Sequence, residues 1–159
     1  MKKIILVFTL VILAVSCKTP APAASTSVDR RSQVAIKGNW TIVSVTYPGS
    51  DMFKVKSFDI ADAKCFEGST WKFISNNDSG EMALTQVGCP GFSSPIKWYV
   101  NKDGQFVLKF LAEGMKAKQQ QVGYILKVDD QTMESFKLLD NINIGGKLTN
   151  VVYQFRKTN

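Results

Sequence analysis

The side chains best suited to chemistry in this chain are three cysteines, Cys17, Cys65 and Cys89, in a sequence that contains no histidine. Without histidine the chain lacks the usual general base and the usual partner that activates a serine or cysteine nucleophile. Two thiols without histidine are also a poor ligand set for zinc. We therefore expect no histidine-dependent hydrolysis, no metal site and no cofactor.

Carboxylates could still perform acid–base chemistry, but most of them stand in turn-forming sequences. Asp78 precedes Ser-Gly, Asp103 precedes Gly, and Asp129 and Asp130 are adjacent. Asp in such positions commonly hydrogen-bonds the nearby backbone and forms a turn. The sequence also contains no glycine-rich phosphate loop of the Walker or dinucleotide-binding type. We interpret these carboxylates as turn formers and expect no catalytic residue and no enzymatic activity.

The first residues have the pattern of an export signal. A Met-Lys-Lys start is followed by an unbroken apolar run over residues 4–15, then by Ser16 and Cys17. Such a run is typical of a leader and is too short to span a bilayer comfortably. Its end resembles a bacterial lipobox, in which the cysteine is acylated and begins the mature protein. We expect residues 1–16 to be a lipoprotein signal peptide and Cys17 to be acylated; an ordinary leader with an incidental Cys17 is the alternative.

The same pattern bears on localisation. Two acyl chains on Cys17 would hold the protein on a membrane without any apolar patch on the fold. Lys18 stands where many lipoproteins of the inner membrane carry Asp, which favours the outer membrane. No acidic cluster follows, so we expect the periplasmic face of the cell envelope. The formal net charge of +7 does not indicate a nucleic-acid partner, because an exported protein rarely meets nucleic acid.

Cys65 and Cys89 remain as an even pair if Cys17 carries the lipid. Disulfides form and persist outside the cytosol. We therefore predict that these two cysteines are bonded. The closed loop would remove about 3–4 kcal/mol of conformational free energy from the unfolded state.

The remaining chain divides into a tether and one domain. Residues 17–33 are rich in Pro, Ala, Ser and Thr and have no periodic apolar face. This composition is typical of a flexible segment. Residues 34–159 are enough for one domain with a hydrophobic core, and they contain no internal repeat.

The domain alternates strand-like segments with turn residues. All connections are short except the one after the first strand. The eight predicted strands cover residues 38–47, 70–75, 81–88, 96–100, 105–111, 121–128, 132–139 and 147–156. Closing eight antiparallel strands into a ring leaves no exposed sheet edge. The expected fold class is therefore all-β, an eight-stranded antiparallel up-and-down barrel.

Residues at the two ends of the predicted barrel resemble those of lipocalins. Gly38 and Trp40 match the G-x-W signature of the first strand, and Arg156 matches the arginine that packs across this tryptophan in the family. With the lipobox and the segment 65–73, they resemble the lipocalin-like lipoproteins of Gram-negative envelopes. The resemblance implies that Trp40 and Arg156 close the bottom of the barrel by cation–π stacking and guanidinium hydrogen bonds.

Strand alternation indicates which side chains fill the barrel. If Trp40 points inward, the apolar phase of the other strands makes the interior aromatic and apolar. Eight strands enclose a space that side chains can just fill or that can hold one small ligand, and both possibilities stay open. The side chains expected to contact a ligand are Trp71, Phe73, Trp98, Phe106, Phe110, Tyr124 and Tyr153.

The long connection over residues 48–69 is too apolar for a free loop. Its apolar residues include Met52, Phe53, Val55, Phe58 and Ile60. In lipocalins the connection after the first strand folds over the open end as a lid. We expect a short helix or an Ω-loop here, pinned by the cysteine pair; a loop packed on the outside of the barrel is the alternative.

Together these features predict a lipid-anchored envelope lipoprotein that binds a small apolar or amphipathic molecule and does no chemistry on it. Affinity would come from desolvating the ligand against the interior rings, with Tyr and Trp as polar contacts. The alternative is a solid-core barrel that docks onto an outer-membrane protein complex or inhibits an envelope enzyme, by analogy with other small barrel lipoproteins.

Overall fold

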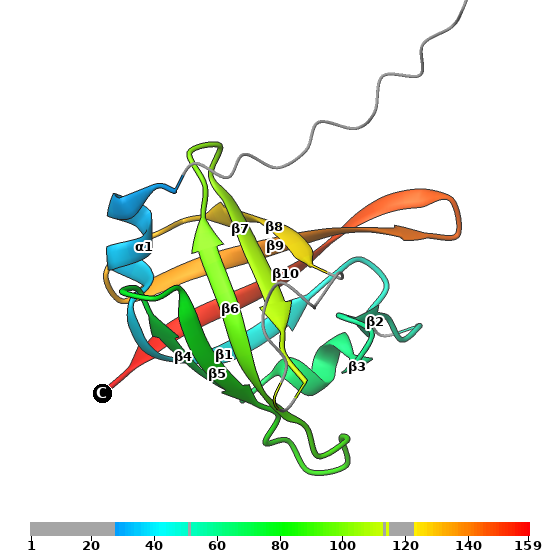
Figure 1. Ribbon diagram of the computed structural model, residues 1–159. Coiled ribbons are helices and arrows are strands. Elements are labelled where there is room, and N and C mark those ends of the chain that lie inside the picture. Colours follow the sequence, from blue (N-terminus) through cyan, green and yellow to red (C-terminus); the bar gives the residue numbers. More distant parts are fainter. Residues whose placement is uncertain (1–27, 51, 113, 115–122) are drawn as a thin grey trace, which may run out of the picture.

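The computed structural model describes residues 28–50, 52–112, 114 and 123–159. Within these ranges eight strands form a closed antiparallel barrel in the order β1-β10-β9-β8-β7-β6-β5-β4 (Figure 1). Each barrel strand neighbours the next barrel strand along the chain, and β1 closes the ring against β10. The predicted up-and-down barrel is confirmed.

Most barrel strands lie close to the predicted segments, but the strand predicted over residues 81–88 is found at Ser79–Ala83, and residues 84–88 belong to the connection that follows it. Alternating burial along each strand separates an inner from an outer face, as in any half-buried strand. The strands are β1 (Gly38–Thr46), β4 (Thr70–Ile74), β5 (Ser79–Ala83), β6 (Ser93–Val100), β7 (Gln105–Phe110), β8 (Tyr124–Asp129), β9 (Ser135–Ile144) and β10 (Lys147–Thr158).

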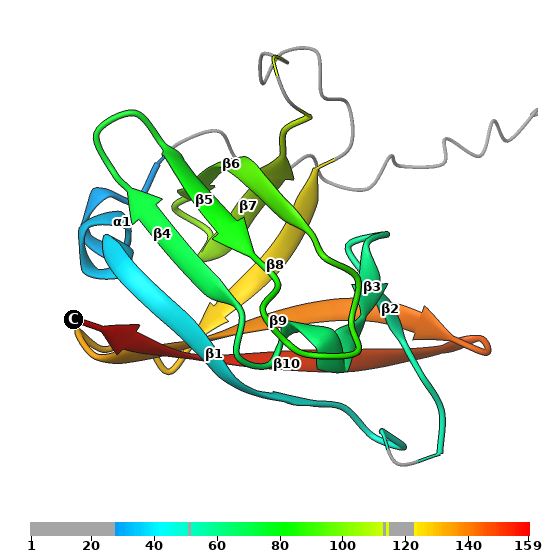
Figure 2. The ribbon, with the colours of Figure 1, turned by 90° about the horizontal axis from the view of Figure 1, so that it is seen from below.

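The last two strands are longer than predicted. They form one hairpin that extends past the rest of the barrel (Figure 2). Gly145 and Gly146, with φ of 58° and 87°, make its turn, and two residues of positive φ suit a tight hairpin. The alternation of Asn and Ile over residues 141–144 is a strand signal beyond the predicted end at residue 139.

A short helix covers one end of the barrel. This helix, α1 (Arg30–Ile36), begins at the N-cap Asp29, whose carboxylate accepts a hydrogen bond from the Arg31 N–H at 3.1 Å. Gln33 and Ile36 are the two residues of this helix that are buried. The expected tether over residues 17–33 is therefore too long at its C-terminal end, because Arg30 to Gln33 already belong to the domain. We call the end that α1 covers the closed end.

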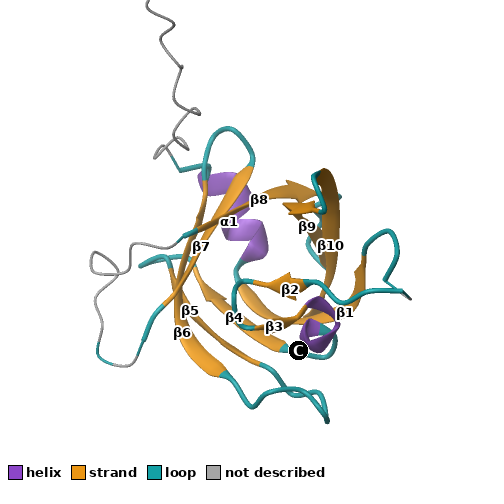
Figure 3. Ribbon diagram, turned by 90° about the vertical axis from the view of Figure 1, so that its right-hand side faces the viewer, coloured by secondary structure: helices purple, strands orange, loops and turns teal. Residues whose placement is uncertain are grey.

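The long connection after β1 covers the opposite end, which we call the mouth. It contains the two-stranded hairpin β2 (Lys56–Ser57) and β3 (Ala61–Asp62), followed by the 3₁₀ helix η1 (Ala63–Phe66). Figure 3 looks into this end, with β2, β3 and η1 across the opening and α1 behind them. We call residues 56–66 the lid. The connection therefore covers the opening, as expected, and does not lie against the outer wall of the barrel.

The disulfide predicted from the cysteine count is present. Cys65 in η1 is bonded to Cys89 in the connection between β5 and β6. It therefore ties the lid to the barrel wall. In the described part of the chain, neither helix is long and apolar enough to cross a membrane.

Candidate functional site

The buried rings of the barrel form two groups. One, the closed-end cluster, comes entirely from barrel strands and consists of Trp40, Phe73, Trp98, Phe106, Phe136 and Phe155. The other, the mouth cluster, lies under the lid and consists of Phe58, Phe66, Phe110, Tyr124 and Tyr153. Trp71 joins the two, because its ring contacts Phe73, Phe155 and Phe110.

The closed-end cluster is filled by its own rings. Phe136 and Phe155 stack with their centroids 4.4 Å apart, and Trp98 stacks on Phe106 at 5.6 Å. Phe73 contacts both pairs, with its centroid 4.9 Å from that of Trp98. Offset and edge-to-face contacts at these distances stabilise a core beyond the burial of apolar area alone. This half of the interior therefore serves as core.

Trp40 closes this end, but with a different cation from the one expected. Its indole N–H donates to the carbonyl oxygen of Ile36 at 2.7 Å, and the Lys157 Nζ lies 5.6 Å from its ring centroid. Trp40 faces Lys157 across the β1–β10 pair, whereas Arg156 faces Thr41 and is exposed. The expected role of Arg156 is therefore wrong, because strand alternation turns it outward and places Lys157 beside the ring.

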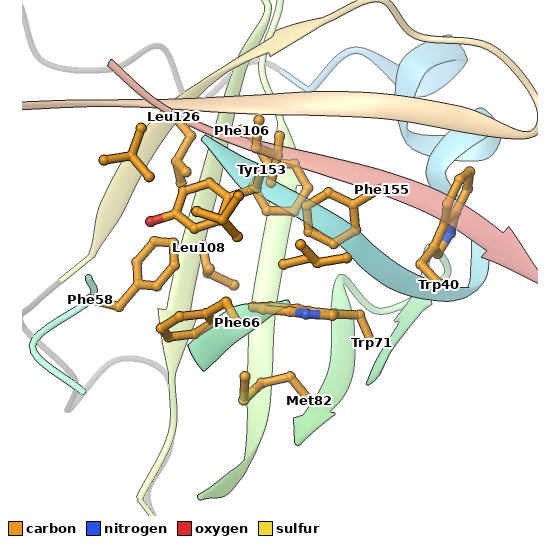
Figure 4. Close-up of a cluster of buried hydrophobic side chains, with 14 of the residues drawn as sticks. Trp40, Phe58, Phe66, Trp71, Met82, Phe106, Leu108, Leu126, Tyr153 and Phe155 are labelled. Atoms are coloured by element: carbon orange, nitrogen blue, oxygen red, sulfur yellow. The ribbon is translucent and has the colours of Figure 1, made fainter. Parts of the chain in front are cut away.

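The mouth cluster is built around a side chain that comes from the lid. Phe58, at the tip of the β2–β3 hairpin, is only 6 % exposed. Its ring stacks on Tyr153 at 5.4 Å and meets Tyr124 and Phe66 edge-on at 5.1 and 5.2 Å. It also lies 5.5 Å from Phe110. Figure 4 shows Phe58 and Phe66 beside Tyr153, with Trp40 at the far end of the barrel.

Two tyrosine hydroxyls of the barrel wall hold the lid in this position. Tyr124 donates to the backbone oxygen of Phe58 at 2.6 Å, and Tyr153 donates to the Ser57 Oγ, also at 2.6 Å. Burial, together with the nearby Asp59 carboxylate, raises the pKa of Tyr124 to about 12. Burial likewise raises the pKa of Tyr153 above its ordinary value. Both hydroxyls therefore remain protonated donors at neutral pH.

Comparison with known proteins identifies this architecture. The family model described as "Lipocalin-like domain" matches residues 36–135, which is more than half of the chain. The chain belongs to the lipocalin-like domain family. No curated protein sequence matches this chain significantly.

Solved structures similar to this lipocalin-like domain include two of bovine odorant-binding protein. A complex with a selenium-containing odorant is 12 % identical, with 77 % of this chain and 72 % of that chain covered and a TM-score of 0.45. The protein from bovine nasal mucosa is 12 % identical, with coverages of 86 % and 78 % and a TM-score of 0.44. Likeness at this level carries no conclusion about a ligand.

The structure separates the ligand residues that we predicted for this lipocalin-like domain. Phe110, Tyr124 and Tyr153 lie at the mouth, and Trp71 lies between the two clusters. Phe73, Trp98 and Phe106 instead contact one another within the closed-end cluster. Six of the seven predicted strand residues are buried in the interior, and Tyr124 is half-buried. Strand alternation does not indicate how far along the barrel each ring is already surrounded.

Three residues of the site were missed as interior contacts. Ser57, Phe58 and Phe66 enter from the lid and not from a barrel strand. Phe58 stood out as an apolar residue of the connection, but no strand pattern could assign it a place inside the barrel. The tyrosine hydroxyls at the mouth were the remaining clue, since a buried Tyr usually requires a hydrogen-bond partner.

Two grooves lie on the described surface, and the first is lined in part by Trp71, one of the predicted ligand residues. One, of about 640 Å³, runs over β1, β4, β5 and β6 near the C-terminus. The other, of about 490 Å³, lies between the end of β1 and the start of β10. Neither groove is lined by a residue of the mouth cluster. Phe66 and Tyr153 at the mouth are at most 1 % exposed, so access to their rings requires the hairpin tip with Phe58 to move.

Proposed function

We propose that this lipocalin-like domain binds a small apolar or amphipathic molecule at the mouth of its barrel and does no chemistry on it. The mouth cluster carries the proposal. It combines apolar rings with a few fixed hydroxyl donors, which is the usual composition of a small-molecule site. It is also covered by a segment that is not part of the barrel wall.

The hairpin part of the lid has little backbone pairing of its own. The β2–β3 hairpin has only two residue pairs, Lys56 with Asp62 and Ser57 with Ala61, and a hairpin of this size is not stable alone in water. Apart from the rings of the mouth cluster, the hairpin tip is held mainly by the two tyrosine hydroxyls. A ligand that replaces these contacts can therefore open the site while the barrel stays closed.

The proposal includes a lipid anchor in a bacterial envelope, on the outer membrane and facing the periplasm. The apolar leader and Cys17 support it, although both lie outside the described residues. The chain enters the domain at the closed end, where the Asp29 N–H donates to the Val100 oxygen at 2.7 Å. A lipid on Cys17 would thus hold the domain by its closed end and leave the mouth accessible.

Native mass spectrometry tests ligand binding directly. The mature chain without its lipid would be produced in the periplasm, and copurifying compounds would be extracted under denaturing conditions. We expect a stoichiometric apolar molecule. An empty protein that also takes up no apolar fluorescent probe would contradict the proposed function.

The anchor has its own test. Cells grown with a labelled fatty acid should incorporate the label into the wild-type protein and keep the protein in the outer-membrane fraction. The Cys17→Ala variant should carry no label. Labelling that persists in this variant would contradict acylation at Cys17.

A second candidate function, a solid-core interaction or inhibitor module for an outer-membrane complex, is favoured by the filled closed-end cluster. The two functions differ at Phe110, which contacts Phe58, Trp71 and Tyr124 in the mouth. Ligand binding predicts that Phe110→Ala abolishes uptake. The interaction module predicts that the same variant is only less stable and that a partner protein is still captured.

A further inference from the structure

Phe58 occupies the interior in an unusual way. All the rings that Phe58 contacts come from barrel strands or from η1, whereas Phe58 itself lies at the tip of a two-stranded hairpin. Its ring has four aromatic neighbours and is 6 % exposed. Because the β2–β3 hairpin is not part of the barrel wall, the Phe58 ring packs on the wall in the way that a bound molecule would.

The backbone of the hairpin tip depends on this insertion. Phe58 and Asp59 have φ of 52° and 56°, a left-handed conformation that Asp tolerates but that is unfavourable for a bulky residue such as Phe58. Turns of this kind usually carry Asn-Gly. The ring contacts of Phe58 and the two tyrosine hydrogen bonds therefore hold the tip in a conformation that its own sequence disfavours. Loss of these contacts would release the tip.

The groups that would remain after the β2–β3 hairpin has moved away, with η1 still in place, define the ligand. Phe66, Phe110 and Tyr153 surround the position of the Phe58 ring, which suits a flat apolar group. The hydroxyls of Tyr124 and Tyr153 would lose their acceptors, the Phe58 carbonyl and the Ser57 hydroxyl. A replacement therefore needs a hydrogen-bond acceptor next to its ring, because unpaired buried donors are costly.

The charge of Asp140 further restricts the chemical class of the ligand. Asp140 lies on the inward face of β9, two residues from the buried Leu138 that pairs with Tyr153 and opposite the buried Val151 of β10. Together with burial, it raises the pKa of both mouth tyrosines, and it stays in place when the hairpin moves away. An anionic ligand would therefore bring a second negative charge next to Asp140 in a partly desolvated site, which is costly.

We infer that Phe58 is a tethered stand-in for the ligand, and that the mouth takes an uncharged molecule with an aromatic ring and a carbonyl-type acceptor. Such a molecule binds by displacing the β2–β3 hairpin, with its ring in the place of the Phe58 ring and its acceptor on the Tyr124 hydroxyl. The inference rests on the proposed function and narrows it to one chemical class.

A fluorescence titration of the mature chain without its lipid tests this inference. The probe is 6-propionyl-2-(dimethylamino)naphthalene, an uncharged aromatic ketone whose emission reports both polarity and hydrogen bonding. Phe58→Ala removes the internal competitor and should raise the affinity for the probe at least tenfold. Ser57→Ala weakens the lid but leaves the wall intact, so a smaller rise is expected. Met52→Ala, at an 84 % exposed position of the same connection, is the matched control and should bind as the wild type does.

The ligand class is tested by competition in the Phe58→Ala variant. Acetophenone should displace the probe better than ethylbenzene, which has a similar shape but no carbonyl. Tyr124→Phe in this background should remove the preference. A fluorescent fatty acid should bind more weakly than the ketone, because it brings an anion to the mouth.

The outcomes separate the inference from the proposed function. Equal probe affinity in the wild type, Phe58→Ala and Ser57→Ala would overturn the tethered stand-in while leaving ligand binding intact. Tighter binding of the fatty acid than of the ketone would overturn the ligand class. Failure of every variant to bind either probe would remove the proposed function itself. Near-ultraviolet circular dichroism verifies folding, and Ser57→Ala carries the prediction alone if Phe58→Ala does not fold.

Discussion

The two ends of this barrel contain similar numbers of buried rings but are built in different ways. At the closed end, all rings come from barrel strands, and the indoles of Trp40 and Trp98 donate to nearby backbone oxygens. At the mouth, Phe58 and Phe66 come from the lid, and the wall tyrosines donate to the lid. The two ends are therefore alike in aromatic content but differ in the elements that supply their rings.

The largest expected difference between the two ends is in stability. Phe73→Ala deletes a ring with contacts to four other rings of the closed-end cluster, and we expect it to lower the free energy of unfolding by about 3–5 kcal/mol. Phe58→Ala should cost less than half as much, because the hairpin tip can relax. Urea unfolding of both variants measures the difference. Equal losses would show that the mouth is as much a part of the core as the closed end.

Removing the disulfide should loosen the mouth selectively. Cys65 and Cys89 are 24 residues apart, and their replacement by Ala should lower the free energy of unfolding by about 2–4 kcal/mol. Hydrogen exchange should also become faster in residues 56–66 than in the closed-end strands, since the lid loses its covalent attachment. Uniform acceleration across the barrel would mean that the lid does not open separately.

A smaller effect is expected where the lid joins β1. Glu67 accepts from the Val45 N–H and from Lys64 Nζ, each at 2.9 Å. Burial opposes the charge, but these hydrogen bonds outweigh it and lower the pKa of Glu67. Glu67→Gln should therefore cost about 1 kcal/mol at neutral pH.

The pH dependence of that cost follows from the lowered pKa of Glu67. The stabilisation is complete above the pKa of an unfolded-state Glu, about 4.3, and is lost as the pH falls through the lower folded-state value. Urea unfolding at pH 7 and pH 3 should show the wild type and Glu67→Gln converging at low pH. A difference that is independent of pH would exclude the charge of Glu67 as its cause.

The smallest effect is expected at the closed end, in the cation over Trp40. Lys157→Gln should lower the free energy of unfolding by about 0.5–1 kcal/mol, because it removes the cation–π contact. Arg156→Gln is the matched control on the outer face and should change stability by less than about 0.5 kcal/mol. Thermal unfolding of the pair measures the difference, and the reverse order of effects would restore Arg156 as the closing residue.

Local sequence patterns predicted most of the fold and part of the site. Alternating apolar residues and turn sequences predicted the barrel strands, and the cysteine count predicted the disulfide. The prediction placed Arg156 over Trp40, but the register of β1 against β10 places Lys157 there. Consecutive side chains point to opposite faces of a strand, so an error of one residue assigns the role to the wrong residue. Helix α1 was missed because only Gln33 and Ile36 of its short sequence are buried.

The insertion of Phe58 at the mouth could not be predicted, for a different reason. The apolar character of the connection indicated a lid, but the insertion of Phe58 depends on residues far away in the chain. The Tyr124 hydroxyl that binds its carbonyl lies 66 residues further on, and the Tyr153 hydroxyl bonds Ser57 across 96 residues. Contacts of this range leave no periodic signal within the segment itself.

The closure of the ring between β1 and β10 also determines when this protein can fold. Asn39 pairs with Thr158 and Thr46 with Val152, so the first barrel strand obtains one of its two partners only after nearly the whole chain is available. Pairing across such a separation is entropically costly and slow. Until it occurs, β1 presents an unpaired edge that other chains can bind. A newly made chain is therefore exposed to aggregation through the edge of β1 until the ring closes.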